Sequence, residues 1–166
     1  MTSSHQNNAS DPANLALNYA YGVLEGECRA AINAVGLEPS VGFLHEFSSY
    51  QTKQSLVYDL QDPFRWLADV TVLKAFESGV LDLPDFYFTG DDYRYRFEFD
   101  AKQWFPDLFR ERFNSAIRYK GRSLKWDTVI EQKIVELGRY LAGRTGGLKF
   151  SEPYLDLTRT DGAEVS

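Results

Sequence analysis

The chain has 166 residues and a formal net charge of −6, with 43% hydrophobic and 15% aromatic residues, which allows one domain with a sizeable core and excludes wholesale disorder. The acidic balance argues against a generic nucleic-acid binder, and the single cysteine, Cys28, excludes a disulfide framework and favours a reducing, cytoplasmic location. No apolar run approaches the about 18 residues of a membrane span and the N-terminus lacks a signal pattern, so we expect a soluble chain with no membrane partner.

The first predicted element is a long helix that follows a polar tail. Residues 1–10 are polar and of low complexity, which predicts a disordered tail. Asp11 before Pro12 predicts the start of the helix, and Gly36 predicts its end. The apolar positions of this helix are Leu15, Leu17, Ala20, Val23, Leu24, Ala31, Ile32 and Val35. Its predicted polar face carries Glu25, Glu27 and Arg29.

A second helical segment is predicted after a polar stretch. Residues 46–54 are rich in Ser, Gln and Thr and predict a loop. A helix is predicted from Ser55 to about Ser78, with Gly79 just beyond its end. Pro63 lies inside this pattern, so we expect the helix to be kinked or divided there.

Candidate metal ligands lie on both sides of that loop. His45 precedes it, and Asp59 and Asp62 follow it with the three-residue spacing that places two side chains on one helical face. One imidazole and two carboxylates suit Mg²⁺ or Mn²⁺, whereas one nitrogen ligand without a thiolate argues against structural zinc. Each residue also has a simpler interpretation: His45 as a structural histidine, Asp62 as a helix cap before Pro63, and Asp59 as a residue facing water. Spacing alone does not decide between them.

Residues 86–99 predict a β-hairpin. Alternating aromatic residues flank a turn at Gly90, Asp91 and Asp92. Arg94 and Arg96 lie between Tyr and Phe residues, where they fit either a nucleic-acid contact or the solvent face of the strand pair.

The last predicted elements are two helices joined by a basic loop. Asp100 and Gln103 match a capping box, which predicts a helix to about Ile117. The final helix is expected to start at or beside Ser123 and to end before Gly143. Its predicted inward residues are Trp126, Val129, Ile130, Ile134, Leu137 and Leu141.

The predicted architecture is therefore mainly α, with four to five main helices and one small β-hairpin. These elements form a helical domain over residues 11–143, and residues 144–166 form a C-terminal tail.

Basic residues concentrate in the second half of the chain. Residues 1–90 hold four Lys or Arg against eleven Asp or Glu, whereas residues 101–149 hold eleven against five. The predicted loop carries three cations around a glycine: Arg118, Lys120 and Arg122. This arrangement fits a phosphate contact beside an acidic metal site, and it also fits a solvated basic turn with ordinary charge scatter.

Several motifs in the same order resemble the CRISPR-associated spacer-acquisition integrase family. They are NLALNYAYGVL at 14–24, GLEP at 36–39, GFLH at 42–45, SLVYDLQDPFR at 55–65 and RYKGR at 118–122. The similarity covers roughly residues 11–143. It implies the helical catalytic domain of a metal-dependent DNA integrase and endonuclease.

The resemblance also implies residue roles and partners. His45 and Asp62 match positions that hold Mg²⁺ or Mn²⁺ in the family, and Asp59 matches the neighbouring acidic position, as a ligand or as a residue that steers bound water. We accordingly expect His45 and Asp62 to converge on one point, with Asp59 beside them. The expected partners are DNA (protospacer and repeat), a second copy of the chain and the small companion protein of the adaptation complex. The cations expected to contact phosphates are Arg65, Arg118, Lys120 and Arg122.

The chain departs from the family pattern in two ways. The family's third ligand is a Glu about 65 residues before the histidine, whereas 44 residues precede His45 here, and the family's N-terminal β-domain is absent. We therefore expect a fragment, a split gene product or a catalytically incomplete protein. One alternative is a non-catalytic helical remnant that binds DNA or dimerises. A small-molecule enzyme is the least favoured alternative, because the sequence offers no cofactor motif.

Overall fold

The computed structural model describes residues 9–42, 54–90 and 94–146. His45, nearly all of the predicted loop 46–54, most of the predicted N-terminal tail and the end of the C-terminal tail lie outside these residues. Among the described residues, no helix is long and apolar enough to cross a bilayer.

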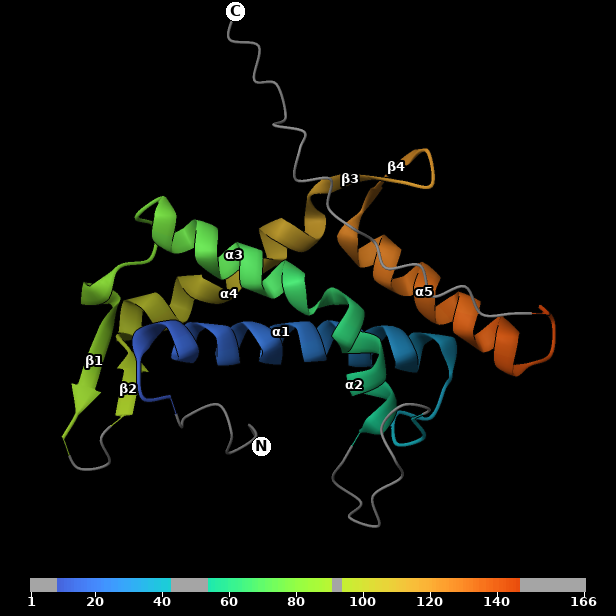
Figure 1. The fold of residues 1–166 in the computed structure, drawn as a ribbon, viewed down its shortest axis with the longest axis horizontal. Coiled ribbons are helices and arrows are strands. Elements are labelled where there is room, and N and C mark those ends of the chain that lie inside the picture. The colour runs from blue at the N-terminus through green and yellow to red at the C-terminus, as the bar shows by residue number, and fades with distance from the viewer. Residues whose placement is uncertain (1–8, 43–53, 91–93, 147–166) are drawn as a thin grey trace, which may run out of the picture.

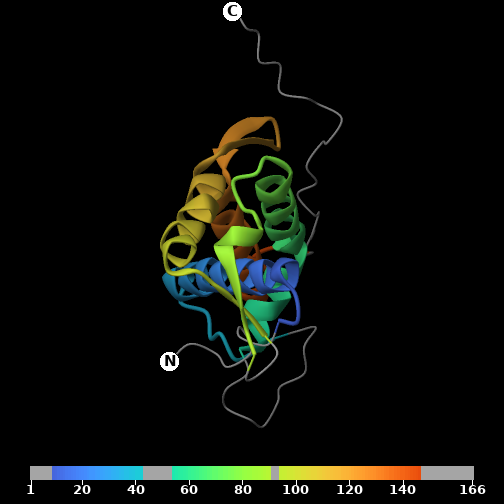
Figure 2. The same cartoon turned by 90° about the vertical axis from the view of Figure 1, so that its left-hand side faces the viewer.

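Helix α1 (Pro12–Val35) is the element on which the others pack. Asp11 caps it by accepting a hydrogen bond of 2.8 Å from the backbone N–H of Asn14, and Gly36 ends it with a left-handed φ of 77°. Both predicted ends are confirmed. Helices α3, α4 and α5 lie on the same side of α1 (Figures 1 and 2), and α1 contacts each of them. The side chain of Cys28 is fully buried.

The second helical segment is divided at Pro63, as predicted. Helix α2 (Ser55–Gln61) is followed by a single 3₁₀ turn, η2 (Asp62–Phe64), and then by α3 (Arg65–Glu77). Proline lacks a backbone N–H and its ring crowds the preceding turn, which explains the change of helix type at this point. Phe64, within the break, is fully buried.

The strand pairing of the first hairpin is confirmed, whereas Asp91 and Asp92 of its predicted turn lie outside the described residues. Strand β1 (Phe86–Thr89) pairs antiparallel with β2 (Arg94–Phe97), after a short 3₁₀ turn, η3 (Leu83–Asp85). Phe86 pairs with Phe97, their ring centroids are 4.9 Å apart, and both side chains are buried against the helices.

The chain between the last two helices differs from the prediction. Helix α4 (Phe99–Asn114) ends before Ile117, and its N-terminal residue has no side-chain cap, so the predicted capping box is wrong. The predicted basic loop is instead a second hairpin of β3 (Ala116–Tyr119) and β4 (Arg122–Lys125). Lys120 and Gly121 form its two-residue turn with positive φ values of 48° and 79°, the conformation that hairpin turns favour.

Helix α5 (Trp126–Leu141) therefore starts three residues later than predicted. Five of its six predicted inward residues are buried, because they recur with helical spacing on the face toward α1 and α4. Leu141, in contrast, is 61% exposed, because it lies on the last turn beyond the core. The predicted mainly α fold is confirmed, with a second hairpin added.

Candidate functional site

The two candidate carboxylates lie in different environments. Asp59, on α2, is 1% exposed, so the alternative that it faces water is wrong. Because burying a carboxylate without a partner is costly, we infer that groups around Asp59 stabilise its side chain. Asp62, in η2, has a side chain 43% exposed. No side-chain cap is present at the start of η2 or α3, so the capping role considered for Asp62 is also wrong.

The chain that leads to His45 packs tightly on the turn that carries Asp59. The backbone N–H of Leu56 donates to the carbonyl of Pro39 over 3.0 Å, which joins this segment to the start of α2. A Cβ atom added at Gly42 would lie 2.6 Å from Cβ of Ser55 and 2.8 Å from Oδ2 of Asp59. Such distances are too short for a side chain, so only glycine allows this approach.

The convergence of His45 with Asp62 stays a prediction, because His45 lies outside the described residues. Within those residues, no three His, Cys, Asp or Glu side chains gather as a metal site would. Glu25 and Arg29, predicted on the polar face of α1, form an ion pair, and Nε of Arg29 donates to Oε1 of Gln54 over 2.5 Å. These contacts hold α1 against the start of α2.

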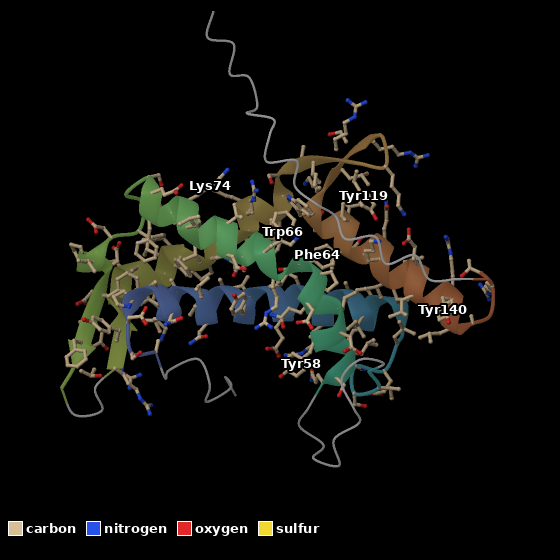
Figure 3. All side chains as sticks on the ribbon, in the orientation of Figure 1. Tyr58, Phe64, Trp66, Lys74, Tyr119 and Tyr140 are labelled. Carbon is tan, nitrogen blue, oxygen red and sulfur yellow. The ribbon has the colours of Figure 1, made fainter. Side chains whose placement is uncertain are left out.

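Arg65, on the first turn of α3, lies beside Asp62. Its Nη1 is 3.5 Å from Oδ1 of Asp62, and its guanidinium carbon lies 4.8 Å from the centre of the Tyr21 ring. The Arg65 side chain is 53% exposed, so it remains accessible to an anion. On the buried side of the break, Phe64 and Trp66 point into the fold (Figure 3), and the Trp66 ring packs edge-on against Trp126 of α5 at 5.1 Å.

The other predicted cations lie on the second hairpin. Arg118, Lys120 and Arg122 are exposed, whereas Tyr119 is buried beneath the turn. Nζ of Lys120 is 2.5 Å from Oε1 of Glu136, and this hydrogen bond raises the pKa of Lys120. No ion pair joins Arg118 or Arg122 to another residue of the described part of the chain. Within this hairpin, the charges of the two arginines are therefore exposed and make no ion pair with other described residues.

The hairpin and the carboxylates do not form one compact site. Figures 1 and 2 both place β3 and β4 at the side of the molecule away from α2. Sequence analysis missed this second hairpin, because Gly121 is the only residue of its turn that favours a positive φ. It also missed the close approach of Gly42 to Asp59, which no sequence pattern indicates.

The fold of this helical domain is shared with a solved casposase and a solved Cas1 protein. A solved casposase bound to its integration product is 39% identical, with a TM-score of 0.81 over 90% of this chain and 41% of that one. A Cas1 protein from Thermotoga maritima, 18% identical with a TM-score of 0.68, shares the fold over 81% of this chain and 42% of that one.

The sequence comparisons identify the family. The family model for CRISPR associated protein Cas1 matches residues 1–111. CRISPR-associated endonuclease Cas1 3 of Thermus thermophilus is 34% identical over 137 residues, which are 81% of this chain and 35% of that protein. CRISPR-associated endonuclease Cas1 of Korarchaeum cryptofilum is 29% identical over 153 residues, 90% of this chain and 40% of that protein. The chain belongs to the Cas1 family, as its motifs indicated, and spans between a third and two fifths of these relatives.

Proposed function

We propose that this chain supplies the helical catalytic domain of a metal-dependent DNA integrase and endonuclease that acts in CRISPR spacer acquisition in the cytoplasm. The observation that carries this proposal is the likeness to the casposase bound to its integration product, at 39% identity and a TM-score of 0.81. The relatives in Thermus thermophilus and Korarchaeum cryptofilum are named endonucleases, which supports the same chemistry.

In this proposal His45 and Asp62 hold Mg²⁺ or Mn²⁺, and Asp59 is a further ligand or orients a bound water. The donor set suits these ions. The exposed carboxylate of Asp62 is available to a ligand, and Gly42, three residues before His45, packs against Asp59. Three residues span at most about 11 Å, so the histidine is within reach of this turn. When bound, the ion would stabilise charge on phosphate oxygens and activate the attacking hydroxyl.

The chain's own side chains have distinct roles in this chemistry. Asp59 is buried, and in this proposal its neighbours fix its orientation toward the ion. Arg65 presents an exposed guanidinium beside Asp62 and would bind a DNA phosphate, which brings the scissile bond to the carboxylates. The incoming nucleophile is a DNA 3′ hydroxyl in integration and water in cleavage.

We further propose that the third ligand, a Glu, comes from a segment outside these 166 residues. The chain matches only 35% of the Thermus thermophilus relative, so much of that protein has no counterpart here. The proposed partners are DNA (protospacer and repeat), a second copy of the chain and the small companion protein of CRISPR adaptation. A Cas6-RT-Cas1–Cas2 complex shares the fold, with a TM-score of 0.72 at 16% identity.

The second hairpin would contact DNA away from the site. Arg118 and Arg122 are exposed, and their charges are available to backbone phosphates. Lys120 already pairs with Glu136, so its contribution would require exchange of that partner.

Binding of Mn²⁺ tests the metal site without requiring turnover. Titration of the chain with Mn²⁺, followed by electron paramagnetic resonance, should detect weak binding that His45→Ala and Asp62→Asn each abolish. Asp107→Asn is the matched control, because Asp107 is an exposed carboxylate on α4 that pairs with Arg110. Equal binding by all four proteins would refute the metal site and favour a non-catalytic remnant that binds DNA or dimerises.

A further inference from the structure

Tyr21 contacts both sides of the break that Pro63 makes. Its backbone carbonyl accepts a hydrogen bond of 2.8 Å from Nε2 of Gln61, the last residue of α2. Its hydroxyl donates a hydrogen bond of 2.5 Å to Oδ1 of Asp69 on α3. One residue of α1 therefore holds both the element before the break and the element after it.

The ring of Tyr21 also supports Arg65. The guanidinium carbon lies 4.8 Å from the ring centre, within the range of a cation–π contact. Burial, followed by the hydrogen bond to Asp69, raises the pKa of Tyr21 to about 12. The hydroxyl therefore stays protonated and remains a donor at physiological pH.

Arg65 has a carboxylate on each side of it along the chain. Asp62 lies three residues before it and Asp69 four residues after it, and both spacings allow contact on a helix. Among the described residues, the ion pair of Arg65 is with Asp62, over 3.5 Å, whereas Asp69 accepts the hydroxyl of Tyr21. The hydrogen bond from Tyr21 thus holds Asp69 where it makes no ion pair with Arg65.

We propose that Tyr21 is a positioning residue that keeps Arg65 beside Asp62. The ring of Tyr21 lies against the guanidinium, and the hydroxyl of Tyr21 holds Asp69 by a hydrogen bond. The positioning itself follows from these contacts. Its consequence for DNA rests on the proposed function, in which Arg65 binds a phosphate.

Four variants separate the two contacts of Tyr21. Tyr21→Phe keeps the ring and removes the hydroxyl, so Asp69 becomes free to attract Arg65. Tyr21→Phe with Asp69→Asn also removes the competing charge. Tyr21→Leu removes ring and hydroxyl together. Tyr140→Phe is the matched control, because Tyr140 is a half-exposed tyrosine on α5 (Figure 3).

The first measurement needs no DNA. Proton–nitrogen NMR of the Arg65 Nε–H group detects whether the guanidinium lies over the Tyr21 ring, because an aromatic ring shifts the resonances of protons above its face. Tyr21→Leu should move this signal toward that of an unrestrained arginine, Tyr21→Phe should move it part of the way, and Tyr140→Phe should leave it in place. An Arg65 signal unchanged in Tyr21→Leu would overturn the positioning.

The second measurement is affinity for a labelled branched duplex by fluorescence anisotropy. Tyr21→Leu should weaken binding about two- to fivefold, the range of one exposed cation–π contact. Tyr21→Phe should weaken binding less, and adding Asp69→Asn to Tyr21→Phe should restore most of that loss. When Arg65 is already changed to Ala, adding Tyr21→Leu should not lower the DNA affinity further. If Tyr21→Phe with Asp69→Asn bound DNA as weakly as Tyr21→Phe alone, the proposed competition of Asp69 for Arg65 would be wrong. If Arg65→Ala leaves affinity unchanged while the NMR shifts occur, the positioning stands and the phosphate role of Arg65 fails. Far-UV circular dichroism checks that each variant folds.

Discussion

Gly42→Ala tests whether the segment before His45 is fixed against Asp59. The added methyl would lie 2.6 Å from Cβ of Ser55, 2.8 Å from Oδ2 of Asp59 and 2.9 Å from the backbone carbonyl carbon of Ser55. Two of these atoms belong to the first turn of α2 and cannot move without moving the helix. The substitution must therefore displace either the segment or the turn that carries Asp59.

The expected cost is that of overpacking a well-packed site, about 1–3 kcal/mol. For a chain of this size, each kcal/mol corresponds to a fall in Tm of about 2–4 °C. Urea unfolding followed by far-UV circular dichroism measures the free energy, and thermal unfolding measures Tm. If the proposed metal site is correct, Gly42→Ala should also weaken Mn²⁺ binding, because it moves the segment before His45 relative to Asp59.

Gly26→Ala provides a matched control with the opposite sign. Gly26 is exposed within α1, and an added Cβ would meet nothing within 4 Å. Alanine is the better helix former, so this variant should be more stable by about 0.5–1 kcal/mol. If Gly42→Ala were as stable as the wild type or as Gly26→Ala, the tight packing against Asp59 would be refuted.

Three further predictions concern activity, DNA affinity and pH. The chain alone should be nearly inactive on DNA, and robust Mn²⁺-dependent cleavage that His45→Ala abolishes would contradict the need for a ligand from outside it. Changing Arg118, Lys120 and Arg122 together to Ala should lower the slope of log affinity against log salt by about two units, at about 0.9 unit per lost phosphate contact. Lys120 contributes less than a full contact, because it already pairs with Glu136. An unchanged slope would show that the hairpin does not touch DNA. Because the pKa of Tyr21 rises from 10.0 to about 12 on folding, the unfolded chain loses this proton first, and stability should fall as pH rises from 10 to 12. Tyr21→Phe should make this fall in stability smaller when urea unfolding is measured at pH 9, 10 and 11, and an equal fall in both proteins would contradict the shift.

The ends and breaks of helices could be predicted where a single residue type fixes the backbone conformation. Asp11 and Gly36 define α1 because a cap and a left-handed glycine leave few alternatives, and Pro63 divides the next helix because it lacks an N–H. The β3–β4 hairpin was missed because four-residue strands carry little periodicity, and Lys120 adopts a positive φ that its residue type does not favour. Leu141 was misplaced because apolar spacing continues past the end of the core.

The contacts of the candidate residues could not be predicted from the sequence. The spacing of Asp59 and Asp62 suggested one shared helical face, whereas in the structure Asp59 is buried and Asp62, in the 3₁₀ turn at Pro63, is exposed. The role of Tyr21 depends on a contact between residues 48 positions apart, and no local pattern encodes such a contact. Gly42 resembles any loop glycine in the sequence, because its constraint comes from α2.

The separation of the two basic regions has a consequence for how DNA would be held. Arg65 lies at the carboxylates, whereas the hairpin cations lie on the side of the molecule away from α2 (Figures 1 and 2). Interactions that are far apart and share no partner contribute additively to a free energy. The losses of DNA affinity caused by Arg65→Ala and by removal of the hairpin cations should therefore add, whereas those of Arg65→Ala and Tyr21→Leu should not. A duplex too short to reach from Arg65 to the hairpin should therefore lose the hairpin's share of the salt dependence and keep that of Arg65.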